Sequence, residues 1–270
     1  MLDRIRFHSF PVAGIDAMTA ATSRSFPRHT HDQYGVGVID TGGHASLSGR
    51  GQVEAGPGSL IFVNPGEVHD GRPIGGRPRS WRMLYVDTSL MEATRADILE
   101  NANASLAFSA PVFADAELRK LFNIAFRHST PTTAVRDDMA CETAILRLVA
   151  RLAINDAAAR KNTRMPAASI RRARDRIDSD PSARLTLADL ASEVDLSRYQ
   201  LLREFARELG LTPHAYILQK RIALARRLIR GGHALAEAAA IAGFYDQSHL
   251  TRCFVRQFGV TPSRYASSAR

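Results

Sequence analysis

The chain has 270 residues, 45% hydrophobic and 23% charged, with a formal net charge of +9. This length suits two domains that each bury a core, and the composition excludes an intrinsically disordered chain. No run of residues reaches the roughly 18 apolar positions of a spanning helix, and the first residues lack an apolar signal core, so we expect a cytoplasmic protein without a membrane partner.

Residues 1–110 are predicted to form a small antiparallel β-sandwich or barrel. Short β-prone runs in this region alternate with turns that contain glycine. These runs are YGVGVI (34–39), SLIFV (59–63) and WRMLYV (81–86).

Two amphipathic helices are predicted within about 115–159. Apolar residues there recur at i, i+3, i+4 and i+7, as in Leu118, Leu121, Phe122 and Ala125, and again in Ile145, Leu148, Val149 and Leu152. The polar and basic segment that follows is interrupted by a proline, so residues 161–168 are expected to link a first domain, 1–160, to a second, 169–270.

The basic charge is concentrated in the second domain. Residues 169–270 hold 17 Lys and Arg against 10 Asp and Glu, a net charge of +7, whereas residues 1–168 hold 19 against 17, a net charge of +2. Such a surplus is typical of a domain that binds a polyanion, although a solvated basic face has the same composition.

One segment of the second domain occurs twice, 49 residues apart. SRYQLLREFARELGLTPHAY (197–216) returns as DQSHLTRCFVRQFGVTPSRY (246–265). The matching pairs are Leu201/Leu250, Arg203/Arg252, Phe205/Phe254, Arg207/Arg256, Gly210/Gly259, Thr212/Thr261, Pro213/Pro262 and Tyr216/Tyr265. Each copy is preceded by a short apolar helical pattern, which predicts two helix-turn-helix units, at about 187–207 and 235–258. A helix over 213–230, roughly 27 Å long, is predicted to join them.

The helix boundaries in this domain carry explicit signals. Thr186 and Ser197 have the spacing of N-caps whose third residue returns a hydrogen bond, and Thr212 precedes a proline suited to the first helical position. The glycines that follow periodic segments are predicted to end helices in the left-handed conformation. These glycines are Gly210, Gly231 and Gly259.

The paired units, their connecting helix and above all GFYDQSHLTRCFVRQFGVTPSRY (243–265) resemble the DNA-binding domain of AraC/XylS-type transcriptional regulators. The resemblance implies that two recognition helices enter successive major grooves on one face of double-stranded DNA. Asp195 departs from it, standing where the family usually has glycine in the first turn; Asp tolerates the left-handed conformation.

The positions that the resemblance and the helical pattern leave free for DNA divide between the two units. Leu202 offers only apolar contact, so the first unit is expected to read fewer bases than the second. For each arginine a phosphate contact is an alternative to base readout, and for the whole set the alternative is a solvated face. The candidates are Arg198, Tyr199, Leu202, Arg203, Gln247, Ser248, Thr251 and Arg252.

FPRHTHDQYGVGVIDTGG (26–43) and AGPGSLIFVNPGEVHDG (55–71) resemble the cupin-like ligand-binding domain found in many of these regulators. The resemblance implies an effector pocket near His29, His31 and His69. In metal-binding cupins these histidine positions and a Glu converge on an ion, but Gly35 and Val36 stand where that Glu is expected. We therefore expect no metal or other cofactor, and leave open the alternative of a divalent ion held by three histidines.

Together these features predict a two-domain α+β protein with a cupin-like β-barrel, two following helices and an all-α domain of two helix-turn-helix units joined by a long helix. We expect a sequence-specific transcriptional regulator, activator or repressor, that responds to a small-molecule effector. It is expected to have no catalytic residues and to form a homodimer through the first domain, with RNA polymerase as a further candidate partner. The alternatives are a cupin-type metal-dependent enzyme with a DNA-binding domain and an effector-independent DNA-binding protein.

Overall fold

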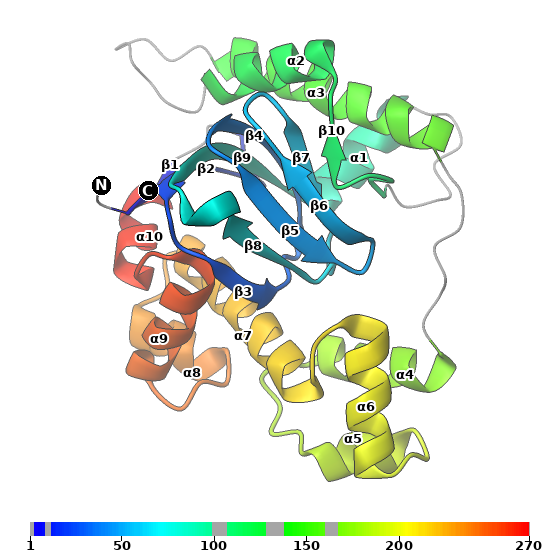
Figure 1. Ribbon diagram of the computed structural model, residues 1–270. Helices are drawn as coiled ribbons and strands as arrows, with labels where there is room; N and C mark the ends of the chain where they lie inside the picture. Colours follow the sequence, from blue (N-terminus) through cyan, green and yellow to red (C-terminus); the bar gives the residue numbers. More distant parts are fainter. Residues whose placement is uncertain (1–2, 9–11, 99–106, 128–137, 160–166, 270) are drawn as a thin grey trace.

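The structure is a computed structural model of the chain, and it describes residues 3–8, 12–98, 107–127, 138–159 and 167–269. The first half folds into a β-sandwich with helices on one outer face, and the second half is entirely helical (Figure 1). The predicted two-domain α+β fold is confirmed.

The sandwich consists of two antiparallel sheets. One has six strands in the order β1-β2-β9-β4-β7-β10, and the other has four in the order β3-β8-β5-β6. The strands are β1 (Arg4–His8), β2 (Ile15–Thr22), β3 (Phe26–His29), β4 (Gln33–Thr41), β5 (His44–Ser48), β6 (Gly51–Ala55), β7 (Leu60–Val63), β8 (His69–Pro73), β9 (Arg79–Asp87) and β10 (Val112–Phe113), with a 3-10 turn at Ile74–Gly76.

The two faces of the six-stranded sheet serve two different cores. In β9, Trp81 and Met83 point into the space between the sheets, whereas Leu84 packs with the covering helices, as the two-residue period of a strand requires. Gly37 lies opposite Met83 in β4, where an added Cβ would fall 2.0 Å from the Met83 sulfur. This strand therefore needs glycine to leave room between the sheets.

Three helices cover the outer face of this sheet: α1 (Thr88–Ile98), α2 (Ala116–Arg127) and α3 (Asp138–Ala159). The apolar residues that predicted the second and third, such as Phe122 and Leu148, are buried. Helix α1 was not predicted, because residues 1–110 were interpreted as β structure alone, and β10 lies between that region and the predicted helices. The helical spacing of Leu90, Met91 and Thr94 was the available signal for α1.

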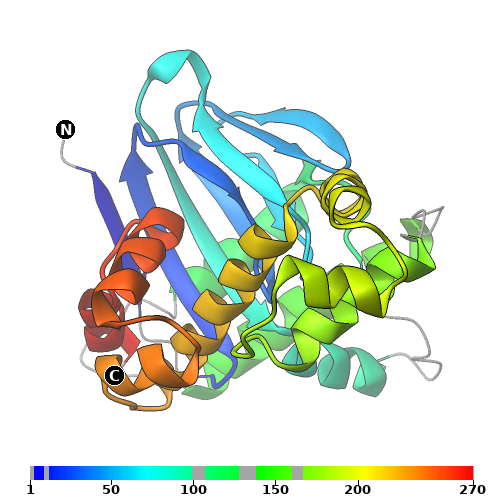
Figure 2. The same ribbon diagram turned by 90° about the horizontal axis from the view of Figure 1, so that it is seen from below.

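The second half consists of α4 (Ala168–Ser179), α5 (Leu187–Glu193), α6 (Arg198–Leu209), α7 (Pro213–Arg230), α8 (Leu235–Ile241), α9 (Gln247–Phe258) and α10 (Pro262–Ala269). The helix predicted to join the two units is α7, and it runs beneath the sandwich with one helix-turn-helix unit at each end (Figures 1 and 2). Residues 161–166 of the expected linker lie outside the described part of the chain. α4 begins at Ala168, one residue before the expected domain start.

Local signals fixed most of these helix boundaries. Thr186 and Ser197 both form reciprocal capping boxes, and Gly210 and Gly259 end their helices with φ of 75° and 72°. Gly231 corrects the prediction, because its φ is −74° and the left-handed residue is the next one, Gly232.

The two helix-turn-helix units differ in how they join the first domain. The second unit and the inner face of the six-stranded sheet share one hydrophobic core, in which Phe7 meets Tyr265 with ring centroids 5.1 Å apart. The first unit has its own core, and Val68 is the one buried sandwich residue in that core among the residues that the structure describes. In the second unit Ala238, Ala239 and Ala242 of α8 and its C-cap are buried, whereas Ala240 is exposed. Across the described residues, no helix is both long and apolar enough for a membrane span.

Candidate effector pocket and DNA-facing helices

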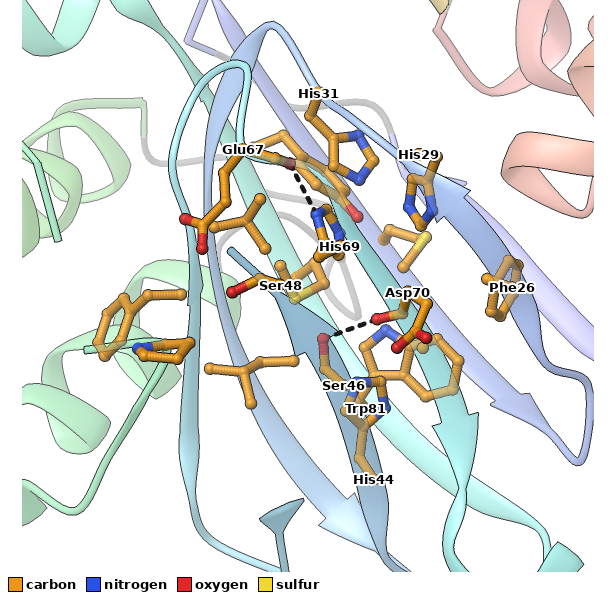
Figure 3. Close-up of a pocket in the computed structure, with 18 of the residues that line it drawn as sticks. Phe26, His29, His31, His44, Ser46, Ser48, Glu67, His69, Asp70 and Trp81 are labelled. Carbon is orange, nitrogen blue, oxygen red and sulfur yellow. Dashed lines mark hydrogen bonds between the residues drawn. The ribbon is translucent and has the colours of Figure 1, made fainter. Parts of the chain in front are cut away.

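A partly open cavity lies between the two sheets (Figure 3). Its wall is mostly apolar and aromatic, with Phe26, Trp81 and Tyr85 among the lining residues. None of the described residues that line it is Lys or Arg. A concave, largely apolar space with a few polar groups is typical of a small-molecule site.

The three histidines singled out from the sequence meet in this pocket. His29 ends β3, His31 follows it on the connection to β4, and His69 begins β8, directly opposite His29 in the antiparallel pair. One ring nitrogen from each lies within 4.8 Å of the others, and Figure 3 shows the imidazoles turned toward one another. Strand register therefore brings His29 to His69, 40 positions further along the sequence.

Backbone contacts fix two of these rings. The Nδ1 of His29 lies 2.7 Å from the carbonyl oxygen of Pro27, and the Nδ1 of His69 lies 3.0 Å from that of Glu67. A carbonyl only accepts hydrogen bonds, so each Nδ1 carries the proton and each Nε2 is left as a bare acceptor.

Burial keeps the histidines of the pocket uncharged. It lowers the pKa of His29 to about 3, with His69 adding to the effect, and lowers the pKa of His69 to about 4. The pKa of His31 is also well below its ordinary value, again mainly because of burial. At neutral pH the pocket thus presents neutral imidazoles and no cationic side chain.

The two carboxylates near the pocket already have partners. Glu67 accepts hydrogen bonds from the backbone and side-chain nitrogens of Asn64, and its carboxylate is directed away from the histidines (Figure 3). Asp70 accepts a bond of 2.7 Å from the backbone N–H of Leu47. Gly35, at the position where metal-binding cupins carry a Glu, faces the Met83 and Tyr85 side chains.

The helical domain closes part of the pocket. Gln257 and Phe258, at the end of the second recognition helix α9, are among the lining residues, and the Phe258 ring centroid lies 6.5 Å from that of His31. The side chain of Gln257 donates a hydrogen bond of 3.2 Å to the carbonyl oxygen of Thr30, the residue between His29 and His31. A molecule in the pocket would therefore contact both domains.

A buried ionic cluster fastens α7 to the sandwich beside this pocket. Arg226 is 2% exposed and bonds to Asp32 at 2.9 Å and to the side-chain oxygen of Gln33. Burial disfavours the charged form of Asp32, but Arg226 and Arg227 outweigh it and hold its pKa below the ordinary value. Both groups therefore stay charged, and the pair orients α7, which joins the two helix-turn-helix units.

The candidate DNA-facing residues form two separate sets, one on α6 and one on α9, at opposite ends of α7 (Figure 1). Tyr199 is 71% exposed and Leu202 37%, and the guanidinium of Arg203 lies 5.9 Å from the centre of the Tyr199 ring. On α9, the hydroxyl of Thr251 donates to the carbonyl oxygen of Gln247, and Arg252 is exposed. Arg198 and Ser248 are exposed in the first turns of the two helices. Their role in DNA contact stays a prediction.

Two features of these surfaces escaped the sequence reading. Tyr245, 92% exposed just before α9, adds an aromatic side chain beside the candidate face, and its position directly before the N-cap residue Asp246 was the available signal. The pocket role of Gln257 and Phe258 had no local signal, because a sequence repeat does not reveal which copy packs against another domain.

Comparison with known proteins now decides the family. The sequence pattern of the AraC-like ligand binding domain matches residues 12–172, and that of a helix-turn-helix domain matches residues 190–268. The chain belongs to the AraC family of transcriptional regulators. This AraC-family regulator has an N-terminal ligand-binding domain and a C-terminal DNA-binding helix-turn-helix domain, as the sequence resemblance implied.

Relatives of this AraC-family regulator are themselves regulators. The chain is similar to the HTH-type transcriptional regulator YbfI of Bacillus subtilis, with 28% identity over 84% of this chain and 82% of the relative. Its fold is similar to that of ToxT from Vibrio cholerae, with a TM-score of 0.57 at 14% identity over 94% of this chain and 98% of ToxT. A ToxT structure with bound unsaturated fatty acid gives a TM-score of 0.54 at 14% identity over 98% and 94% of the two chains.

Proposed function

We propose that this regulator holds its effector in the pocket between the sheets and that the bound effector changes how the two recognition helices meet a promoter. The observation that carries the proposal is the shared wall of the pocket, where Gln257 and Phe258 of the DNA-binding domain stand beside His31 of the sensor. An occupant contacts α9 without any intermediary.

Control requires a ligand that binds two arrangements of the domains with different affinity. The arrangement described here is held by the Gln257 bond to Thr30 and by the Arg226 pair with Asp32. A ligand that displaces Phe258 weakens this arrangement, and a ligand that packs against Phe258 strengthens it. Either change alters the placement of the second reading unit relative to the first.

The proposed DNA contacts divide between the exposed residues of α6 and α9. Ser248 and Gln247 supply hydrogen-bonding groups on the second helix, whereas Tyr199 and Leu202 give the first a more apolar face. Arginine and glutamine recognise base edges in the major groove, and a leucine contacts only the thymine methyl. We infer that the two similar helix-turn-helix units recognise two half-sites of different sequence.

A homodimer through the sensor domain is part of the proposal. Met139 and Leu146 lie seven positions apart on α3 and are 77% and 45% exposed, so one helix face presents two large apolar side chains to solvent. A second copy of the same helix is the occupant we infer, since two linked DNA-binding domains gain from effective concentration.

We further infer a non-catalytic, cytoplasmic regulator that contacts RNA polymerase at the promoter, supported by the regulator relatives.

Selection of duplexes from a random pool with the full chain tests the proposed DNA reading. We expect an enriched site with two different half-sites about one helical turn apart, because α7 separates the units by roughly 27 Å. An enriched site with a single contacted half, or the absence of any enriched sequence, contradicts the proposal. Thermal shifts of the same chain against a metabolite library test the effector pocket, with Phe258→Ala expected to reduce the response.

A further inference from the structure

Three imidazole rings converge in the pocket, and two of them present a hydrogen-bond acceptor to it. The Nδ1 atoms of His29 and His69 are occupied by backbone carbonyls, so the nitrogens that face the pocket are unprotonated. The ring of His31 completes the group, and all three residues are at most partly exposed. Lone pairs that meet without a donor between them attract an electron-pair acceptor.

The donor set narrows the class of acceptor. Neutral imidazoles are the preferred ligands of zinc, nickel, cobalt and ferrous iron, whereas calcium and magnesium require mostly oxygen ligands. The backbone bonds to Nδ1 are the outer contacts that orient a metal-binding imidazole and fix its tautomer. Such contacts are already present for His29 and His69.

We propose that His29, His31 and His69 bind one divalent first-row transition-metal ion, with its remaining coordination positions open to the pocket. The proposed site departs from the expectation of no metal and does not depend on the proposed function, whereas the transmission of metal binding to α9 rests on that function. The residue type at position 35 shapes the site: Gly35 supplies no ligand, and Glu67 is engaged by Asn64, so three histidines hold the ion and solvent or an effector completes the shell.

Binding the ion requires a small contraction of the site. Nitrogens at ~2.1 Å from a tetrahedral ion lie roughly 3.4 Å apart, and the three ring nitrogens lie within 4.8 Å of one another. His31 lies on the connection between β3 and β4, outside the strand pairing of His29 with His69, and its carbonyl oxygen accepts a hydrogen bond of 2.7 Å from the backbone N–H of Gly66. We infer that this connection, rather than the paired strands, takes up the contraction. Loading the site thus draws the His29–His31 segment toward His69.

That segment is bonded to the DNA-binding domain on both sides. The backbone N–H of Thr30 donates to the side-chain oxygen of Gln219 on α7 at 3.4 Å, and its carbonyl accepts from Gln257 on α9 at 3.2 Å. Thr30 stands between two of the proposed ligands, so a contraction at the ion pulls on both helices. The ion is therefore an effector or a required partner of one, and its presence is transmitted through Gln257.

Cobalt titration of chelator-treated full-length protein tests the site. We expect one Co²⁺ per chain with the visible absorption of a four- or five-coordinate ion, and competition by Zn²⁺. His31→Gln and His69→Gln should each weaken binding by roughly 10- to 100-fold or more. His44→Gln, which alters a fourth histidine of the same pocket, is the matched control and should bind as the parent does.

The outcomes separate cleanly. Absence of stoichiometric cobalt in the folded parent, or equal binding by parent and His31→Gln, overturns the site, with circular dichroism verifying that each variant is folded. Amide exchange at the end of α9 tests the transmission: we expect a metal-dependent change in the parent and none in Gln257→Leu, which should still bind one ion. Unchanged exchange in the loaded parent overturns the coupling.

Discussion

Arg226 of α7 and Asp32 of the sandwich form an ion pair of 2.9 Å across the boundary between the two domains. The Arg226 side chain is 3% exposed, and Asp16 contributes a second carboxylate at 3.6 Å. A charge so deeply enclosed is tolerated only while its partners remain in place. The pair therefore fixes how α7, which joins the two helix-turn-helix units, lies against the first domain.

Replacing Arg226 tests this relationship. Arg226→Met leaves Asp16 and Asp32 near the interface without their main partner, and we expect a loss of about 3–5 kcal/mol in the free energy of unfolding. Arg227→Met is the matched control, because Arg227 bonds to the same Asp32 but its side chain is 54% exposed, so its loss should stay below about 1 kcal/mol. Urea unfolding measures both; equal losses would contradict the argument.

Arg252 tests the proposed DNA face. Arg252→Ala should weaken binding to the selected site by about 1–3 kcal/mol and relax the preference at one base pair. Arg77→Ala removes an exposed arginine from the sensor domain and should change affinity little. Fluorescence anisotropy with matched and mutated duplexes measures the effect. A uniform loss across all sequences would indicate a phosphate contact instead of base readout.

His44 makes the stability of the sandwich dependent on pH. Its Nδ1 accepts a hydrogen bond of 2.9 Å from Nε of Arg79, and burial, with Arg79 adding to it, lowers its pKa to about 4. The folded state therefore disfavours the protonated ring. The stability that the neutral His44 ring contributes is complete above about pH 6.5 and is lost as the pH falls toward 4, and its upper bound is about 3 kcal/mol.

The variant His44→Gln isolates this effect, because glutamine offers an acceptor that does not titrate. Urea unfolding between pH 7 and pH 4 should show a shallower decline for His44→Gln than for the parent. His214→Gln, which replaces an exposed histidine on α7, is the control and should follow the parent curve. Parallel curves for the parent and His44→Gln would refute the assignment.

Asp195 holds a left-handed conformation, with φ of 56°. Asp195→Gly should relieve strain of about 1 kcal/mol, partly offset by the greater entropy of the unfolded chain, for a net gain of a few tenths of a kcal/mol. Gly210→Ala makes the opposite change at φ of 75° and should cost about 1 kcal/mol. Thermal unfolding of both variants compares them; a loss of stability in Asp195→Gly would show that its side chain stabilises the turn.

The inferred dimer contact is tested at α3. Leu146→Glu places a charge on the exposed apolar face and should shift the chain toward monomer in sedimentation equilibrium, while the fold persists because Leu146 is 45% exposed. Arg147→Glu, a neighbouring exposed position, serves as the control for a change of charge alone. An unaltered dimer in Leu146→Glu would locate the interface elsewhere, and a monomeric parent would remove it.

Local chemistry explains which parts of the molecule were predictable. The capping boxes at Thr186 and Ser197 depend on residues three positions apart, so the sequence alone predicts where these helices begin. The histidine cluster was anticipated through a family resemblance, and only the register of β3 with β8 brings His69 to His29.

The contacts between domains lay beyond such signals. Gln257 and Glu208 occupy equivalent positions of the repeat, yet Gln257 bonds to Thr30 of the sensor and Glu208 bonds to Arg207 of its own helix. Packing between distant segments made that distinction, and neither the spacing nor the chemical type of the two residues indicates it.

The core of the second helix-turn-helix unit is shared with the sandwich, whereas the core of the first is largely separate. This difference has a consequence for how the regulator can evolve. The buried side of α9 packs against the first domain as well as against its own unit, so a change of Phe254 or Phe258 affects both sets of neighbours. The corresponding residues of α6 pack mainly within their own unit. Among the described residues, Val68 is the buried sandwich residue that joins this core. We therefore expect the operator preference of the first unit to change more freely in evolution, whereas the second unit must keep its packing against the proposed effector pocket.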